Sequence, residues 1–245
     1  FLKMFFPAGF YYKTFMWPPS FWYKIYEPFI RMAAGFGQAS IKHDKERYEH
    51  KYEYCDLLIT GSGPSGLASA YAAAKNGARV ILAEDKPRFG GSLLTSDVNI
   101  GNQTGVEWTE KIIAELKSMP NVTVKNRSQV FGYYDHNMLV MSERISDHLP
   151  KTQKYLPKQR LWYIRANEVL ISSGSIERPL VFGNNDTPGV MLSSAAKEYM
   201  KVYGVLVGKK PLIFTNNDSG YETAIEFKKN GVDPIILDTR SNPSS

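Results

Sequence analysis

The sequence predicts an α/β fold with a parallel sheet, and three observations support this prediction. Apolar, strand-like runs alternate with helix-like segments from Cys55 onward. A glycine-rich turn at 61–66 joins the first strand of this series to the first helix. A strand–helix–strand pattern then begins again at 210–237. We therefore expect a Rossmann-like arrangement of two successive dinucleotide-binding units, the second of them incomplete.

Each element is expected from its own local pattern. Short apolar runs bounded by turn residues predict strands, and alanine-rich or 3.6-periodic runs predict helices. We expect strands at Cys55–Thr60, Arg79–Ala83, Asn121–Lys125, Ser128–Tyr134, Met138–Arg144, Arg160–Arg165, Glu168–Ser172, Lys210–Thr215 and Asp233–Leu237. We expect helices at Pro64–Lys75, Val106–Ser118, Ser193–Tyr203 and Ser219–Asn230, and a hairpin turn at Asp135–Asn137.

Composition divides the chain into three parts. Residues 1–54 form an aromatic-rich packing segment and a charged, exposed link, 55–192 the first dinucleotide-binding domain, and 193–245 the start of a second, degenerate and truncated one. Four prolines in 1–36 argue against one long helix there. So many aromatic side chains predict a segment that packs on the rest of the protein or on a partner subunit. We expect the sequence to be a piece of a longer protein.

The overall composition excludes several classes of protein. A single cysteine, Cys55, excludes a disulfide framework, a CxxC redox pair and a cysteine zinc site. The four histidines show no metal-ligand spacing, so no metal site is expected. The net charge of +6 comes from scattered basic residues, which argues against nucleic-acid binding. No run of about 18 apolar residues suggests a membrane span, and we expect a cytoplasmic protein.

The chemistry of the first unit is carried by Gly61-Ser-Gly63-Pro-Ser-Gly66, which lies between a strand and a helix. Gly61 permits the tight turn, Gly63 leaves room for a pyrophosphate, and Gly66 lets the helix pack closely on the strand. The N–H groups at the helix start favour an anion. Glu84 ends the second strand, where its carboxylate can accept both ribose hydroxyls of an adenosine. The alternative is a glycine turn in a Rossmann-like sheet with an empty site.

The residues around this motif narrow the identity of the ligand only in part. Glu84 is followed by Asp85, so a 2′-phosphate would meet two negative charges and NADP is disfavoured. These residues do not choose between NAD and FAD. Gly91 and Ser92 follow in a double-glycine turn that can bring backbone N–H groups and a hydroxyl near the cofactor. Val130 can present its backbone beside the adenine.

Two further segments characterise the fold. Gly174 lies in a small-residue turn at the end of a later strand, which resembles the returning strand of two-dinucleotide flavoproteins, a group that includes the disulfide reductases. The second unit has Asn216, Asn217 and Asp218 where a working nucleotide loop would have glycines. Because Asp218 would repel a phosphate, we expect a degenerate second site. The absence of paired cysteines excludes disulfide reductase chemistry.

The chain as a whole resembles the alpha subunit of heterotetrameric sarcosine oxidase. The resemblance covers nearly all of the sequence, and the subunits of opine oxidases and dye-linked amino-acid dehydrogenases share the dinucleotide part. The motifs that carry it are Pro7–Pro18, Tyr26–Gly35, Gly61–Gly66, Phe89–Leu94, Phe131–Asn137, Ile176–Phe182, Asn184–Met191 and Phe214–Ser219.

The resemblance implies an oxidoreductase complex of alpha, beta, gamma and delta subunits that demethylates sarcosine to glycine. It implies hydrogen peroxide as a product and, with tetrahydrofolate, methylene-tetrahydrofolate. In such enzymes the amine is oxidised at FAD in the beta subunit, and electrons pass to a covalent FMN near the alpha–beta interface. The alpha subunit binds NAD, and its C-terminal domain, which lies outside this sequence, binds tetrahydrofolate.

The residues matched to the cofactor site by this resemblance are Ser65, Glu84, Asp85, Lys86, Ser92 and Val130. The resemblance assigns no amine-oxidising residue to this segment, so the catalytic residues stay unknown. Two alternatives remain open. The chain can belong to an opine oxidase or a dye-linked dehydrogenase that binds FAD, or it can be a nucleotide-stabilised scaffold without a redox role.

Overall fold

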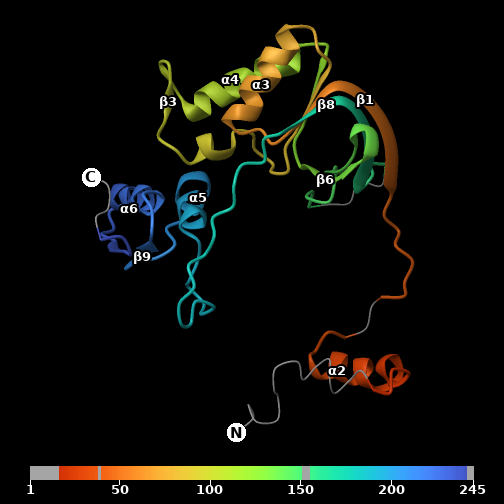
Figure 1. Cartoon of the computed structure of the whole chain (residues 1–245), viewed down its shortest axis with the longest axis vertical. Coiled ribbons are helices and arrows are strands. Elements are labelled where there is room, and N and C mark those ends of the chain that lie inside the picture. The colour runs from red at the N-terminus through yellow and green to blue at the C-terminus, as the bar shows by residue number, and fades with distance from the viewer. Residues whose placement is uncertain (1–16, 38–39, 151–154, 242–245) are drawn as a thin grey trace. The chain divides into compact units, whose positions relative to one another are not determined.

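Figure 1 shows the computed structural model of the chain, which describes residues 17–37, 40–150 and 155–241. The chain forms two compact units, Phe1–Lys45 and Glu46–Ser245. The second unit holds all of the predicted α/β elements. No helix in the described ranges is long and apolar enough to cross a membrane.

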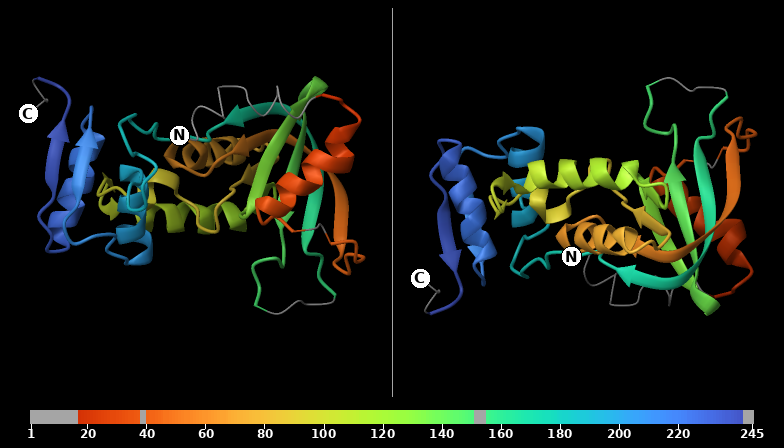
Figure 2. Two further views of the ribbon diagram at one scale, coloured as in Figure 1. Left: turned by 90° about the horizontal axis from the view of Figure 1, so that it is seen from below. Right: turned by 90° about the horizontal axis from the view of Figure 1, so that it is seen from above.

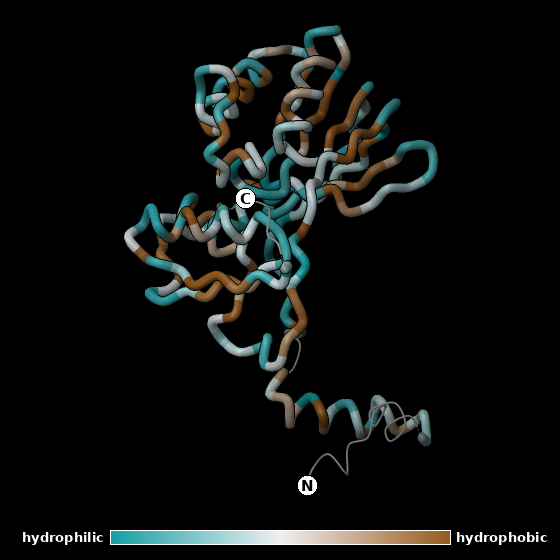
Figure 3. The backbone as a smooth tube through the Cα atoms, turned by 60° about the vertical axis from the view of Figure 1, so that its left-hand side comes forward, coloured by the Kyte–Doolittle hydropathy of each residue, from teal (hydrophilic) through white to brown (hydrophobic). Residues whose placement is uncertain are grey.

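The described residues of the first unit, 17–37 and 40–45, include a short helical run. A π-helical turn, η2 (Trp22–Tyr26), leads into α2 (Glu27–Ala33), and neither element buries a residue. Pro28 does not interrupt the run, because a proline is tolerated in the first turn of a helix. Hydrophobic and hydrophilic stretches alternate along it (Figure 3). Much of the predicted aromatic segment lies in 1–16, outside the described residues, so its packing role stays a prediction.

The second unit is built on a six-stranded sheet. Its order is β5 (Val122–Lys125), β2 (Val80–Ala83), β1 (Tyr48–Thr60), β8 (Gln159–Ile171), β7 (Met138–Arg144) and β6 (Ser128–Tyr134). The first four strands in this order are parallel, and the last two add an antiparallel meander. Because β1 leads to β2 on one side and pairs with β8 on the other, the strand order reverses at β1. Ligands of α/β sheets bind at such a point, beyond the carboxyl ends of the strands.

The largest differences from the predicted strands concern β1 and β8. Strand β1 begins at Tyr48 rather than at Cys55, and one continuous strand, β8, replaces the two predicted at 160–165 and 168–172. The two strands pair from Tyr48 opposite Gln159 to Thr60 opposite Ile171. In the first half of β1 charged and aromatic residues predominate, and most of them are exposed. That composition was interpreted as a charged link, which is therefore shorter than expected.

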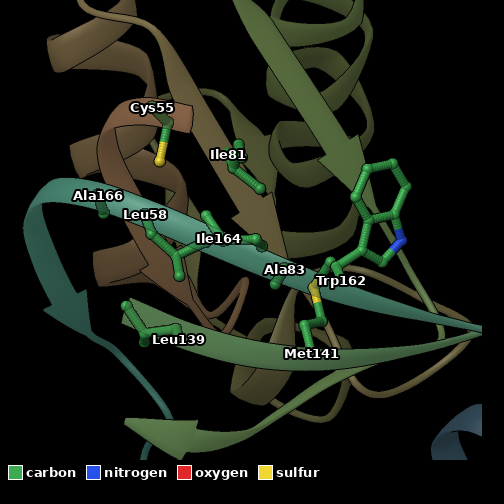
Figure 4. Close-up of a cluster of buried hydrophobic side chains, with 9 residues drawn as sticks. All are labelled: Cys55, Leu58, Ile81, Ala83, Leu139, Met141, Trp162, Ile164 and Ala166. Carbon is green, nitrogen blue, oxygen red and sulfur yellow. The ribbon is translucent and has the colours of Figure 1, made fainter. Parts of the chain in front are cut away.

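Helices cover one face of the sheet and the meander covers the other. Helices α3 (Pro64–Lys75) and α4 (Gly105–Ser118) pack against the first face (Figure 1). Leu67 and Leu116 from these helices are fully buried there, against Ile59 and Leu82 of the strands. On the other face, residues of β7 and β8 pack against residues of β1 and β2 (Figure 4). The side chains of that cluster are Cys55, Leu58, Ile81, Ala83, Leu139, Met141, Trp162, Ile164 and Ala166.

Short elements connect these layers. They are the 3₁₀ turn η3 (Gly91–Leu94), the two-residue strands β3 (Asn99–Ile100) and β4 (Gln103–Thr104), and the turn η4 (Asp135–Asn137). The predicted hairpin turn is confirmed, and it places His136 and Asn137 at positive φ. Thr104 caps α4 by accepting a hydrogen bond from the N–H of Glu107, whose carboxylate bonds back to Thr104.

The C-terminal part repeats the plan of the first. It consists of α5 (Ser193–Tyr203), β9 (Leu212–Thr215), α6 (Ser219–Lys229) and β10 (Ile235–Asp238), with β9 and β10 parallel. Helix α6 lies along this strand pair (Figure 2) and buries Phe227 beside Ile213. Gly220 precedes Asp238 by eighteen residues, as Gly66 precedes Glu84. The second strand–helix–strand unit therefore keeps the same spacing between its helix glycine and its strand-end acid as the first unit.

Candidate functional site

The candidate site is the glycine loop that joins β1 to α3. Gly61 has φ +98°, and a Cβ on it would run into the backbone carbonyl of Ser172. Ser172 follows β8 and donates its N–H to Thr60 O at 2.8 Å. A Cβ on Gly66 would collide with Gly61 O. Both glycines are therefore required by close packing of the loop against the returning strand and the helix.

Gly63 differs from these two glycines. Its φ is −67°, an ordinary value, and no atom lies within 4 Å of the position that a Cβ would take. Gly91 lies beside it, since a Cβ on Gly91 would be 2.9 Å from Gly63 Cα. Packing of this chain therefore gives no reason for glycine at 63, whereas a phosphate approaching the exposed N–H groups of the α3 start would need that space. Ser65 lies exposed in that first turn.

Behind the loop, Ser62 holds the carboxylate of Glu84. Glu84 Oε2 accepts from Ser62 N at 2.9 Å and from Ser62 Oγ at 2.5 Å. Ser62 is fully buried, and its carbonyl accepts from Gly90 N at 3.0 Å. One residue, Ser62, thus links the glycine loop to the end of β2 and to the double-glycine turn. Sequence reasoning missed Ser62, although a hydroxyl between two motif glycines, with an acid ending the next strand, was a usable signal.

The geometry limits what Glu84 can still accept. Its other oxygen, Oε1, accepts from Lys86 N at 2.9 Å. A carboxylate has about four lone-pair positions, and the bonds from Ser62 and Lys86 take three of them. In this arrangement Glu84 has room for one ribose hydroxyl, whereas the sequence predicted that it would accept two.

Asp85 and Lys86, which follow Glu84, point to other partners. Asp85 lies exposed, with its carbonyl accepting from Arg144 at 2.7 Å and its carboxylate 3.8 Å from the same guanidinium. Lys86 Nζ donates to both carboxylate oxygens of Glu198, at 2.9 and 3.0 Å. The hydrogen bond to Glu198 raises the pKa of Lys86 above its ordinary value.

The remaining candidate residues lie around the same end of the sheet. Ser92 is exposed in η3, next to Gly91. Val130 lies two residues beyond Ser128, whose N–H donates to Glu84 O at 2.7 Å, so the backbone of β6 passes the end of β2. Gly174 has φ +71° and open space around it, two residues after Ser172. The structure therefore places these predicted residues around the same end of the sheet.

Other reactive groups in the described residues offer no second centre. Cys55 is buried in the sheet core, and burial raises the pKa of its thiol to about 12. A thiol with that pKa is protonated at neutral pH and is a poor nucleophile. No group of three or more acidic, histidine or cysteine side chains that could hold a metal ion occurs in the ranges that the structure describes.

The second loop is arranged differently from the first. Asn217 bonds within the loop, with its Oδ1 accepting from Ser219 N at 3.0 Å. Arg240 N donates to Asp238 Oδ1 at 2.9 Å, as Lys86 N does to Glu84. The Arg240 guanidinium then bonds Asp238 at 2.8 Å and Asp218 at 2.7 Å. A pair of carboxylates and an arginine thus occupies the region where the first unit keeps an open glycine loop.

Comparisons with known proteins agree with this geometry. A family profile described as FAD dependent oxidoreductase matches residues 56–148. Over 240 residues, 98% of the chain, the sequence is 48% identical to the alpha subunit of sarcosine oxidase from Rhizobium meliloti (strain 1021). Nearly the whole chain therefore matches one portion of a sarcosine oxidase alpha subunit. The corresponding protein of Corynebacterium sp. (strain P-1) is 36% identical over 86% of the chain.

The match covers a small part of these relatives. The chain spans 24% of the Rhizobium protein and 22% of the Corynebacterium protein. A subunit of opine oxidase from Agrobacterium tumefaciens (strain Ach5) is 27% identical over 78% of this chain and 38% of its own length. These two sarcosine oxidase proteins are thus more similar to this chain than that opine oxidase subunit is.

Solved structures confirm the predicted fold class. L-proline dehydrogenase from P. horikoshii superposes with a TM-score of 0.63 at 22% identity, over 82% of this chain and 38% of that one. Thioredoxin reductase from Lactococcus lactis has a TM-score of 0.51 at 18% identity, over 78% of this chain and 59% of that one. The chain therefore has an α/β dinucleotide-binding fold with a mainly parallel sheet, as these two proteins have.

Proposed function

We propose that this chain is the dinucleotide-binding part of a sarcosine oxidase alpha subunit. The observation that carries the proposal is 48% identity to such a subunit over 98% of the chain. The whole enzyme would oxidise sarcosine to glycine, with hydrogen peroxide and, given tetrahydrofolate, methylene-tetrahydrofolate as products. The beta, gamma and delta subunits would complete it, and we propose a cytoplasmic location.

The role of this chain is to bind and orient an adenosine dinucleotide. The open space in front of Gly63 and the start of α3 suit a pyrophosphate. The remaining acceptor of Glu84, held in place by Ser62, suits one ribose hydroxyl. Val130 would offer backbone groups to the adenine. These residues contact only the half of the molecule that NAD and FAD share.

We assign NAD to this site from the family resemblance, and FAD is the alternative. The match of 56–148 to an FAD dependent oxidoreductase profile favours the alternative. Bound FAD would supply redox chemistry at the site. Oxidation of the amine is assigned to FAD in the beta subunit, with FMN as the next electron acceptor. Among the described residues we name none that acts on the amine.

Release of the nucleotide from the purified complex tests the proposal. The protein is denatured, and the nucleotide in the supernatant is identified by chromatography and mass spectrometry. NAD in amounts equal to the alpha subunit would support the assignment. One equivalent of FAD beyond that of the beta subunit would transfer the site to FAD, and no nucleotide at all would overturn dinucleotide binding.

A scaffold without a redox role is the second candidate. The sequence has a single cysteine, Cys55, and its thiol is buried with a pKa raised to about 12, which favours this candidate. Anaerobic addition of sarcosine to the complex separates the two roles. Absorbance growth at 340 nm from the bound nucleotide would mean a hydride carrier, whereas flavin bleaching alone would mean a scaffold.

A further inference from the structure

The nucleotide site has a neighbour from the C-terminal part of the chain. Lys86 lies directly after the end of β2, and its backbone N–H binds the carboxylate of Glu84. Its ammonium group has a different partner. It bonds both oxygens of Glu198, which lies on α5 and is 112 residues away in sequence.

The position of Lys86 gives this contact a chemical meaning. In dinucleotide-binding folds the acid that ends the second strand bonds the ribose 2′-hydroxyl, and a basic side chain nearby accommodates a 2′-phosphate. Lys86 is bonded to that acid through its own backbone, so its ammonium is the cation placed to meet a 2′-phosphate. Arg144, another cation at this turn, is taken up by the carbonyl and carboxylate of Asp85.

Glu198 is held in place by further contacts of α5. Asp97, in the loop before β3, forms ion pairs with Lys201 of α5 and with Lys229 of α6. Lys201 also pairs with Glu226 at 3.4 Å. At the other end of α5, the carboxylate of Glu177 accepts from Ser194 N at 2.7 Å. Helix α5 is therefore anchored at both ends, and these contacts hold Glu198 beside Lys86.

We propose that Glu198 is a specificity-determining residue, which holds the ammonium group of Lys86 away from the ribose and so selects adenosine nucleotides that lack a 2′-phosphate. The inference rests on the proposed dinucleotide site and extends it. It gives the degenerate C-terminal part a role in the first site. It applies equally to NAD and FAD, because neither carries a phosphate at that hydroxyl.

The test compares two probes on the full-length complex after its bound nucleotide has been removed. ADP-ribose and 2′-phospho-ADP-ribose differ only in the group at issue, and their dissociation constants are measured by calorimetry. In Glu198→Gln the free lysine should shift the ratio of the two constants about fivefold toward the 2′-phosphate, the size of a single partly exposed charge contact. The matched control Glu222→Gln removes an ion pair of α6 with Lys197 and should leave the ratio unchanged.

A second variant shows whether the effect acts through the lysine. In the double variant Glu198→Gln with Lys86→Gln, the ratio should return to the wild-type value. An unchanged ratio in Glu198→Gln, with both probes binding, would overturn the inference while leaving the site intact. A shift that persists in the double variant would also overturn it. Failure of the wild type to bind either probe would instead refute the proposed function.

Discussion

Gly63 and Gly61 belong to one motif, but valine at each should have opposite consequences. At Gly63 the φ of −67° suits any residue, and the Cβ position has no atom within 4 Å. We expect Gly63→Val to change the free energy of unfolding by less than about 1 kcal/mol. Its methyl groups would fill the approach to the loop, and overpacking of about 1–3 kcal/mol corresponds to a roughly 5- to 150-fold weaker nucleotide affinity.

Gly61→Val provides the contrast. Its φ of +98° is strained for a β-branched residue, and the side chain would meet the backbone of Ser172. We expect a loss of about 3–5 kcal/mol of stability. Urea unfolding measures the stability of both variants, and calorimetry with ADP-ribose measures binding by Gly63→Val. Normal affinity in Gly63→Val, or its failure to fold, would refute the reasoning that this glycine is kept for a ligand.

Three further predictions concern single side chains. Ser62→Ala should lose about 1.5–3 kcal/mol in urea unfolding, because a buried hydrogen bond to a charged group is removed; a neutral result would show that the bond adds nothing. Cys55 should react with Ellman's reagent at pH 8 only after unfolding, since its pKa is raised to about 12; rapid reaction of the native chain would contradict this. Asp97 has its pKa lowered from 3.8 to about 2 by its two lysines, so its stabilising effect exists above pH 4 and is lost as pH falls toward 2. The free energy of unfolding of Asp97→Asn should therefore differ from that of the wild type at pH 6, and the difference should shrink as pH falls through 2. A difference of constant size from pH 6 to below pH 2 would exclude the ionic cause.

Sequence reasoning succeeded where the determining chemistry is local. The limits of β6, β7 and α5 match the prediction residue for residue, because each is bounded by its own turn signals. The glycine motif was found for the same reason, since three glycines in six residues encode a turn, an approach and a packing contact.

It failed where partners far apart in sequence decide the outcome. The first half of β1 looks like a charged link, and only its pairing with β8 makes Tyr48–Tyr54 a strand. The hold of Ser62 on Glu84 depends on two strand ends lying side by side. The contact of Lys86 with Glu198 joins segments that no local pattern connects.

The close packing of Gly61 against the backbone of Ser172 also bears on when the glycine loop can form during synthesis. Strand β1 can pair with β2 soon after both leave the ribosome, but β8 arrives only after the whole meander has been made. Such long-range pairing is slow, because the loop must close before its contacts contribute. We therefore expect the glycine turn to take its final shape only after β8 has paired with β1, because Gly61 packs against Ser172 at the end of that pairing.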